Sequence, residues 1–272
     1  METQSYLSEN RGEFPTDYRF DPQAARAWME ANWQSYCAVW LSLYIAAIAW
    51  LKRDREKKEK LTCKGPLLVW NISLAVFSLI AATKILPWFL YALSGKGYYY
   101  SICSASYLIE NRETSYWNLL FALSKAPELG DTLFLLLKKQ PLRFLHWYHH
   151  VTVLLYCWHA HSEYASTGLW FTAMNLVVHS IMYSYFAART FGVNVRREIA
   201  MLITTLQILQ MIMGFIVSLS AGYFKFYGHP CQVTPHNAII SILMYLSYLA
   251  LFVAFFRDSY VRKPRVHSKK DS

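Results

Sequence analysis

Seven apolar stretches recur along this 272-residue chain, and they restrict its possible folds more than any other feature. A helix needs roughly 20 mostly apolar residues to cross a bilayer. Only 16% of the residues are charged and 55% are hydrophobic, whereas soluble domains carry about 25% charged residues. The sequence therefore predicts an all-α polytopic membrane protein with seven transmembrane helices, at 35–51, 66–93, 116–137, 144–160, 168–188, 199–222 and 237–256.

The basic residues predict how these helices are oriented. Of the 27 Lys and Arg residues, 19 fall in alternate loops and in the C-terminal tail, and six fall on the other side. Since Lys and Arg accumulate in cytosolic loops, we expect a luminal N-terminus and a cytosolic C-terminus. The predicted organisation is a luminal segment 1–34, a transmembrane domain 35–257 and a cytosolic basic tail 258–272. The net charge of +10 is explained in this way without nucleic-acid binding.

Cysteines and C-terminal lysines bear on the same topology. Cys103 and Cys231 both fall in predicted luminal loops, where an oxidising lumen would let this pair form a disulfide. Cys63 lies in a predicted cytosolic loop. The chain ends HSKKDS, and Lys269 and Lys270 resemble the dilysine retrieval signal of endoplasmic reticulum membrane proteins. That signal works only on a cytosolic tail, so the sequence predicts a multi-pass protein of the endoplasmic reticulum membrane.

Polar side chains interrupt four consecutive predicted spans. Such groups are costly in lipid and usually face a cavity or a partner. They repeat every three or four residues, so each set lies on one face of its helix: Lys125, Glu128 and Asp131; His146, His149 and His150; Asn175, His179 and Tyr183; Thr204, Gln207 and Gln210. We expect the four faces to form a common chamber that opens toward the cytosol and has an apolar blind end. Such a chamber suits a substrate with a charged head and a long hydrocarbon tail.

Structural roles are alternatives for part of this set. Thr204, Gln207 and Gln210 could simply join helices by hydrogen bonds, and the charged residues of the third span could be a buried ion pair that fixes packing. Pro127 is expected to bend that span. His159 and His161, at or beyond the luminal end of the fourth span, are expected to be solvated, and Cys157 is expected to pack.

The histidine cluster HWYHH at 146–150 allows two kinds of chemistry. Membrane di-iron oxygenases use clustered histidines as ligands, but such sites gather many ligands, and only His179 adds to this set. No metal site is therefore predicted. Neutral imidazole can also act as a nucleophile or base, and an acyl-imidazole formed from a thioester passes its acyl group on readily.

Four motifs then show a family resemblance. KAPELGDT, LHWYHH, NLVVHSIMYSYF and TTLQILQ resemble, in order and spacing, the motifs of the ELO family of very-long-chain fatty acid elongases, over residues 66–257. HWYHH, FALSKAPELGDT and MYLSYLALF are most similar to the branch that elongates saturated and monounsaturated chains of about sixteen carbons. One position of the family's usual aromatic pair differs, since Phe186 follows Tyr185.

The resemblance implies a 3-ketoacyl-CoA synthase in which six helices enclose an acyl tunnel and a seventh packs outside. Long-chain acyl-CoA and malonyl-CoA would condense to 3-ketoacyl-CoA, CO2 and CoA, with no cofactor. The reductases and dehydratase of the elongation cycle are implied partners. The oligomeric state stays open, a homodimer included.

Imidazole chemistry and the resemblance together give expected roles. His149 would be the nucleophile, His150 and His179 would handle protons or the oxyanion, and His146 would orient them. The expected substrate-binding residues are Lys125, Glu128, Asp131, Asn175, Tyr183, Gln207 and Gln210. A His-box di-iron desaturase or hydroxylase and a non-catalytic acyl-lipid-binding protein are the alternatives.

Overall fold

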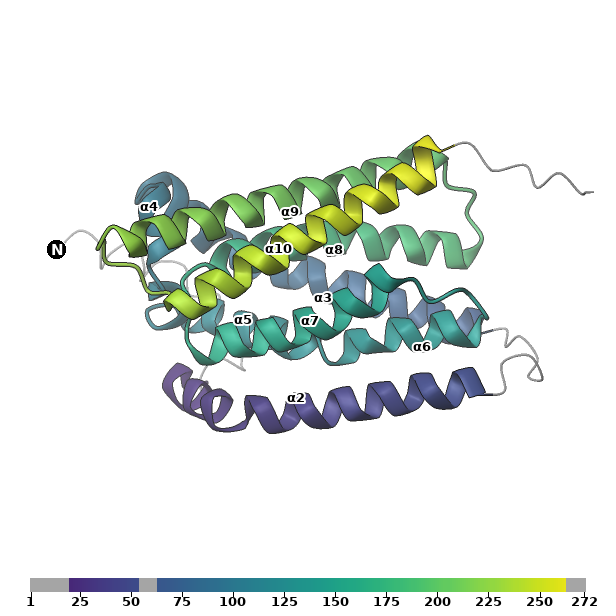
Figure 1. Ribbon diagram of the computed structural model, residues 1–272, viewed down its shortest axis with the longest axis horizontal. Helices are drawn as coiled ribbons and strands as arrows, with labels where there is room; N and C mark the ends of the chain where they lie inside the picture. Colours follow the sequence, from purple (N-terminus) through teal and green to yellow (C-terminus); the bar gives the residue numbers. More distant parts are fainter. Residues whose placement is uncertain (1–19, 54–62, 263–272) are drawn as a thin grey trace, which may run out of the picture.

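The computed structural model describes residues 20–53 and 63–262, and these residues form helices and no strand (Figure 1). The α-helices are α2 (Pro22–Arg53), α3 (Lys64–Leu90), α4 (Tyr98–Cys103), α5 (Arg112–Ser124), α6 (Gly130–Leu137), α7 (Phe144–Ser162), α8 (Gly168–Phe191), α9 (Arg197–Phe226) and α10 (Pro235–Phe256). Short turns of 3-10 helix occupy Ser106–Leu108 and Pro127–Leu129, and π-helical turns extend α3 over Tyr91–Gly95 and α10 over Arg257–Val261.

Four of these helices are long and apolar enough to cross a membrane: Pro22–Arg53, Lys64–Gly95, Arg197–Phe226 and Pro235–Val261. Their outward faces are apolar, since Leu43, Leu209 and Leu243 are each more than half exposed. A continuous apolar exterior of this kind requires lipid as solvent. The chain is therefore a multi-pass membrane protein.

The other three predicted spans correspond to helices that are shorter or more polar. The window 116–137 is covered by α5 and α6, of 13 and 8 residues, and the windows 144–160 and 168–188 by α7 and α8. The histidines and the asparagine of α7 and α8 lower the hydropathy of these helices. Helix covers each predicted window, with a break in the third, and four of the seven qualify as spans by length and composition.

One helix, α2, crosses the predicted boundary at residues 34 and 35. Helix α2 begins at Pro22 and runs unbroken to Arg53. Asp21 caps its start, because its side chain accepts from the backbone N–H of Gln23 at 2.8 Å. The missed turns carry polar residues such as Arg26 and Glu30, so an apolar window finds only the membrane-sized part. Residues 1–19, the loop 54–62 and the tail with Lys269 and Lys270 lie outside the described residues.

Pro127 interrupts the third predicted span rather than merely bending it. Helix α5 ends at Ser124, a 3-10 turn follows, and α6 starts at Gly130. A proline lacks the N–H that a continuous helix would need. Gly130 is required at the restart, because a Cβ there would lie 2.9 Å from the Trp70 ring. The interruption brings α3 close to the polar residues that follow Pro127.

The helices pack in a layered bundle (Figure 1), with α9 and α10 along one edge and α2 along the opposite edge. Extensive contacts join α3 to α8 and α9 to α10, whereas α2 packs on α5, α6 and α7. The contact between α9 and α10 is close because Gly214 leaves room for the Tyr245 ring, which a Cβ would approach to 2.2 Å. Helix α7 contacts α2, α5 and α10, and helix α8 contacts α3, α4 and α9.

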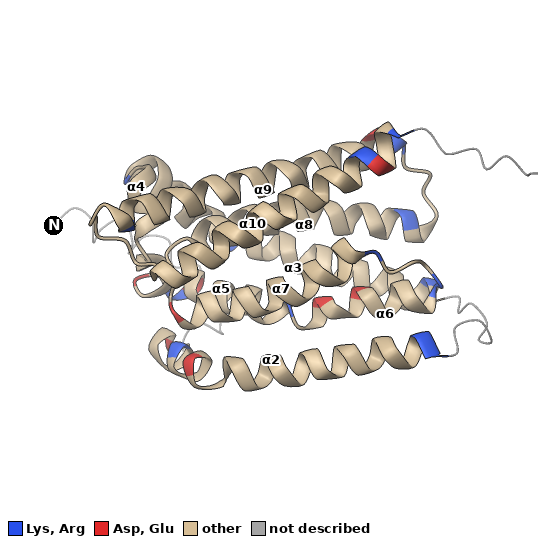
Figure 2. Cartoon of the chain, viewed as in Figure 1, with Lys and Arg blue, Asp and Glu red and all other residues tan. Residues whose placement is uncertain are grey.

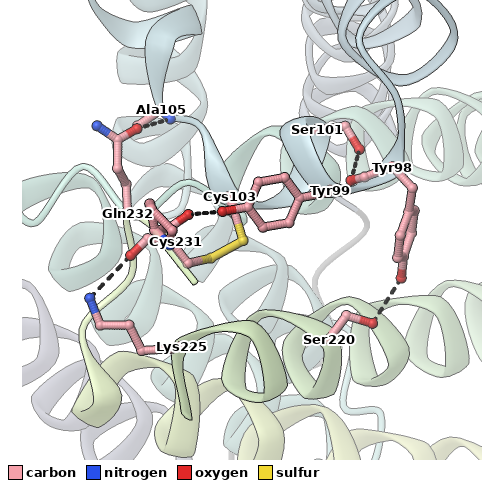
Figure 3. Close-up of a disulfide and its surroundings, with 10 residues drawn as sticks. Tyr98, Tyr99, Ser101, Cys103, Ala105, Ser220, Lys225, Cys231 and Gln232 are labelled. Atoms are coloured by element: carbon pink, nitrogen blue, oxygen red, sulfur yellow. Dashed lines mark hydrogen bonds between the residues drawn. A yellow bond between two sulfur atoms is a disulfide. The ribbon is translucent and has the colours of Figure 1, made fainter. Parts of the chain in front are cut away.

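A disulfide fastens one end of the bundle (Figure 3). It joins Cys103, at the end of α4, to Cys231, between α9 and α10, which is the pair expected from the sequence. Gln232 extends the tie: its N–H donates to the Cys103 carbonyl at 3.0 Å, and its carbonyl accepts from Ser166 at 2.9 Å. Three connections that are remote in sequence are thereby held together at this end.

Candidate active site

A polar cavity of about 760 Å³ lies between the helices and reaches the end of the bundle opposite the disulfide. Ten of the eleven residues expected from the sequence to be catalytic or substrate-binding line it: Glu128, Asp131, His146, His149, His150, Asn175, His179, Tyr183, Gln207 and Gln210. The helical spacing thus placed four polar faces around one chamber. Lys125 is the exception, because it lies behind the wall, with 1% of its surface exposed.

Lys125 holds one carboxylate of the wall in place. Its Nζ donates to Glu128 Oε1 at 2.7 Å and to Asn175 Oδ1 at 3.0 Å, and it lies 4.3 Å from the centre of the Phe121 ring. Glu128 Oε2 is 4.0 Å from His179 Nδ1. A buried charge needs such a partner. Lys125 therefore links α5 to α8 and fixes the carboxylate that faces His179.

Asp131 is held from two other helices. Trp70 Nε1 donates to Oδ1 at 2.7 Å, and the Tyr183 hydroxyl donates to Oδ2 at 2.8 Å. His150 Nε2 lies 4.0 Å from Oδ2. The expected binding residue Tyr183 thus acts here on a carboxylate of the chain itself. Trp70 was not expected, since one tryptophan on an apolar helix gives no periodic signal.

His146 is anchored by a hydrogen-bonded chain from the outer helix α2. The hydroxyls of Tyr44 and Thr132 are 2.8 Å apart, and Thr132 Oγ1 is 2.9 Å from His146 Nε2. The His146 and His150 rings follow at a centroid distance of 4.6 Å. Tyr44 and Thr132 were also not anticipated, although Thr132 belongs to the KAPELGDT motif.

His149 differs from the other three histidines in its surroundings. Within the described residues its ring forms no hydrogen bond or ion pair, and it packs 4.9 Å from the Tyr248 ring. It also lines a second, narrower cavity of about 60 Å³. His149, Asn175, Gln210 and Met211 line both cavities, so the imidazole with unoccupied nitrogens stands where they meet.

The two cavities differ in chemistry. The narrow one is lined largely by apolar and aromatic side chains, among them Val153, Phe171, Met244, Tyr245 and Tyr248. The mouth of the large one carries Lys138, Arg143 and Arg189. A basic mouth attracts polyanions, and an apolar pocket accepts a hydrocarbon. Together they fit an amphiphile with an anionic head.

Two expectations about polar residues need revision. His161 is buried rather than solvated, with 5% of its surface exposed, and its Nδ1 is 3.1 Å from Asn118 Oδ1. His159 stacks on Trp33 at 5.3 Å. The error has a physical cause: α7 runs two residues beyond the apolar window, to Ser162, and the ring of Tyr164 lies 5.7 Å from that of His161.

The sixth predicted span is partly structural. The Thr204 hydroxyl donates to the Ala200 carbonyl at 3.0 Å and lies 3.2 Å from the Tyr260 hydroxyl. Gln207 Nε2 contacts the Met182 sulfur at 3.2 Å.

Among the described residues no three His, Cys, Asp or Glu side chains are grouped so as to hold a metal ion.

Fold and site define a multi-pass membrane protein with a histidine-lined chamber that joins a basic mouth to an apolar pocket. The chain belongs to the ELO family: the model of that family, described as the GNS1/SUR4 family, matches residues 28–268. This finding confirms the resemblance seen in the four motifs.

Curated relatives cover almost the whole chain. Very long chain fatty acid elongase 6 of Drosophila melanogaster is 41% identical over 250 residues, which span 91% of this chain and 79% of the relative. The human protein of the same name is 40% identical over 260 residues, 95% of this chain and 97% of the relative. Human very long chain fatty acid elongase 3 is 34% identical over 273 residues and all of both chains.

Proposed function

We propose that this protein is the condensing enzyme of fatty acid elongation, a very-long-chain 3-oxoacyl-CoA synthase. It joins a long-chain acyl-CoA to malonyl-CoA and releases CO2 and CoA. One observation carries the proposal: an imidazole without a hydrogen-bond partner among the described residues, His149, stands where the polar and apolar cavities meet. The relatives named as elongases support the same reaction.

The proposed architecture has seven transmembrane helices, of which six enclose the acyl tunnel and α2 packs outside. Helix α2 packs mainly on α5, α6 and α7, and this supports its outer position. The proposed location is the endoplasmic reticulum membrane, with a luminal N-terminus and a cytosolic C-terminus. The basic ends of α2, α6, α8 and α10 at one end of the bundle support this orientation (Figure 2).

The substrates enter from the cytosol in this proposal. The phosphates of CoA bind near Lys138, Arg143 and Arg189, where charge attracts them. The acyl tail occupies the narrow cavity, so the thioester carbonyl stands beside His149. Membrane lipid surrounds the apolar outer faces of the helices.

Condensation proceeds in two steps. A lone pair of His149 attacks the thioester carbon and the C–S bond breaks. CoA leaves as a thiolate that takes up a proton from solvent, and an acyl-imidazole in its cationic, acyl-imidazolium form is left behind. Malonyl-CoA then loses CO2, and its enolate carbon attacks the acyl carbon. The new C–C bond forms as the C–N bond breaks, which restores neutral imidazole and gives 3-ketoacyl-CoA.

The remaining residues support these steps in distinct ways. His150 and His179 handle protons or donate to the oxyanion, and the side-chain amides of Asn175, Gln207 and Gln210 supply further donors. Asp131 and Glu128 orient His150 and His179, and Lys125 balances the charge of Glu128. His146 is oriented by Thr132. Malonyl-CoA is a co-substrate, no cofactor takes part, and the reductases and dehydratase of the cycle act on the product.

A mass-spectrometric assay tests the function directly. Purified protein is incubated with palmitoyl-CoA and malonyl-CoA, without a reductant or added metal and in the presence of a chelator. The expected product is a 3-ketoacyl-CoA two carbons longer. No product, together with iron that copurifies in stoichiometric amount, would contradict the proposal and favour the di-iron desaturase or hydroxylase. Bound acyl-CoA without turnover would favour a lipid-binding protein.

A further inference from the structure

Asn71 of α3 lines the large cavity, and no step of the proposed mechanism uses it. Its side chain is buried, with 4% of the residue exposed. Nδ2 donates to the Thr190 hydroxyl of α8 at 3.4 Å, which is long for a hydrogen bond, and Oδ1 forms no hydrogen bond within the described residues. A buried amide that is paired this weakly is costly. A ligand in the cavity would complete its hydrogen bonds.

Helix α8, along which α3 packs, forms a continuous wall of the same cavity. The cavity-lining residues on the cytosolic half of α8 recur every three or four positions and include His179, Met182, Tyr183, Phe186, Arg189 and Thr190. Ten residues with a rise of 1.5 Å each put Arg189 about 15 Å along the axis from His179. This wall therefore connects a histidine of the proposed site to a cation of the mouth.

The pantetheine arm of CoA matches this wall in length. Roughly thirteen bonds separate the sulfur of CoA from its nearest phosphorus, and an extended chain advances about 1.25 Å per bond, so the arm spans about 16 Å. When the phosphates lie at Arg189, the thioester therefore lies at the level of His179.

Asn71 lies beside the outer part of this path. Trp70, its neighbour in sequence, donates to the same carboxylate as Tyr183, and Asn71 itself donates to Thr190. The Asn71 side chain is thus between the levels of Tyr183 and Thr190, about 6 to 16 Å along α8 from His179. Of the two amides in the arm, the inner lies about 4 to 5 Å from the sulfur and the outer about 9 to 10 Å. Only the outer amide falls within the reach of Asn71.

The chemistry of Asn71 suits this amide. The pantetheine arm carries no charge, so the cations of the mouth cannot recognise it. A side-chain amide offers N–H donors and a carbonyl acceptor, which are the groups that a secondary amide needs as partners. Leu67, one helical turn from Asn71, lines the same cavity and offers an apolar contact to the methyl groups next to the outer amide.

We propose that Asn71 binds the outer amide of the pantetheine arm and holds both CoA thioesters along the wall formed by α3 and α8. This inference rests on the proposed condensing activity and adds a substrate-binding residue to it. Asn71 touches the arm and not the reacting atoms, so it acts equally on long-chain acyl-CoA and on malonyl-CoA.

Truncated thioesters test the proposal. Palmitoyl-CoA carries the phosphates and both amides, palmitoyl-pantetheine lacks the phosphates, and palmitoyl-N-acetylcysteamine keeps only the inner amide. Asn71→Leu should lower kcat/KM about tenfold or more for the first two, as for the loss of a buried hydrogen bond, and should leave the third within about twofold. Asn71→Asp, which keeps the size of the side chain but loses the donor, should show the same selective loss.

Two further variants are controls for this test. Arg189→Gln should lower kcat/KM for palmitoyl-CoA alone, because only this thioester carries phosphates for the mouth to bind. Asn194→Leu is the matched control, since Asn194 is exposed in the loop after α8 and lines neither cavity. It should leave kcat/KM unchanged for all three thioesters.

The outcomes separate the two proposals. Product from the wild-type protein, with Asn71→Leu and Asn71→Asp lowering kcat/KM equally for all three thioesters or for none, would overturn the role of Asn71 and leave the condensing activity standing. No product from the wild-type protein with any thioester would refute the proposed function. The dissociation constants of CoA and pantetheine then still test Asn71: both should rise about tenfold in Asn71→Leu, and unchanged constants would overturn the contact.

Discussion

At the scale of residues, the histidines of the polar cavity are distinguished by what holds each ring. His146 is hydrogen-bonded to Thr132, and His150 and His179 each face a carboxylate at 4.0 Å. Of these four histidines, only His149 lines both cavities. An oriented ring suits proton transfer, and a ring with unoccupied nitrogens suits attack on carbon.

Tyr44→Phe tests whether the outer helix positions His146. Loss of the Tyr44 hydroxyl removes its hydrogen bond to Thr132 and loosens the ring. We expect kcat to fall about three- to tenfold with KM unchanged, as for the loss of one hydrogen bond. Thr132→Val should give at least the same loss, and the double variant should lose no more than Thr132→Val alone.

The control for this test lies on the same helix. Tyr36 is exposed on α2, so Tyr36→Phe should leave kcat unchanged. Additive losses in the double variant would show that Tyr44 and Thr132 act separately and would contradict the hydrogen-bonded chain.

Helical spacing was sufficient to predict which polar side chains line the large cavity. Within each helix the polar residues, such as His146, His149 and His150 of α7, recur every three or four positions. A polar stripe on an apolar helix avoids lipid only by facing the interior of the bundle. Trp70 and Tyr44 were not predicted as site residues, because each is a single aromatic residue on an apolar helix. His161 was misplaced because its burial depends on Asn118 of α5 and on Tyr164, which lies beyond the apolar window.

At the scale of elements, close helix contacts and one interruption shape the bundle. The break at Pro127 was expected as a bend, and local sequence cannot show that Trp70 packs against Gly130 where α6 restarts. Helix α2 was predicted too short because its first turns are polar. The contact between α9 and α10 depends on Gly214, whose role becomes visible only with Tyr245 in place.

Gly214→Ala is expected to destabilise the protein. A Cβ at this position would lie 2.2 Å from Tyr245 Cε1, so the ring or the helix must shift. Overpacking of this kind costs about 1–3 kcal/mol, and the melting temperature in detergent should fall accordingly. Gly222→Ala on the same helix is the control, since its Cβ would meet Ile242 at an ordinary 3.7 Å. An equal effect of both substitutions would contradict the packing argument.

At the scale of the whole molecule, most of the Lys and Arg residues that the structure describes lie at the end of the bundle opposite the disulfide (Figure 2). The described ends of α2, α6, α8 and α10 carry Lys and Arg at one end of the bundle (Figure 2), and Cys103–Cys231 lies at the other. The count of Lys and Arg residues along the chain predicted the same uneven division. The prediction succeeded because the bias of Lys and Arg concerns the loops, and the apolar windows show where the loops lie.

Cysteine labelling in sealed endoplasmic reticulum vesicles tests this orientation. A membrane-impermeant maleimide should label Cys63 from the cytosolic side, because Cys63 is partly exposed. Cys103 and Cys231 are joined in the disulfide and buried, so they should stay unlabelled until the vesicles are permeabilised and the protein is reduced and denatured. Cys37, which is buried, serves as the unreactive control before denaturation. Labelling of Cys231 in sealed vesicles treated with a permeant reductant would reverse the orientation.

The most direct test of the central claim is the reaction of the purified protein with palmitoyl-CoA alone, quenched rapidly and analysed by peptide mass spectrometry. The account predicts that CoA is released before malonyl-CoA is added and that one acyl group is attached to His149. Adding malonyl-CoA should convert this adduct into the 3-ketoacyl product, and His149→Ala should lose both adduct and activity, the latter by about a thousandfold or more. Product formation with no prior CoA release, or a His149→Ala variant of near-normal activity, would contradict the acyl-imidazole mechanism.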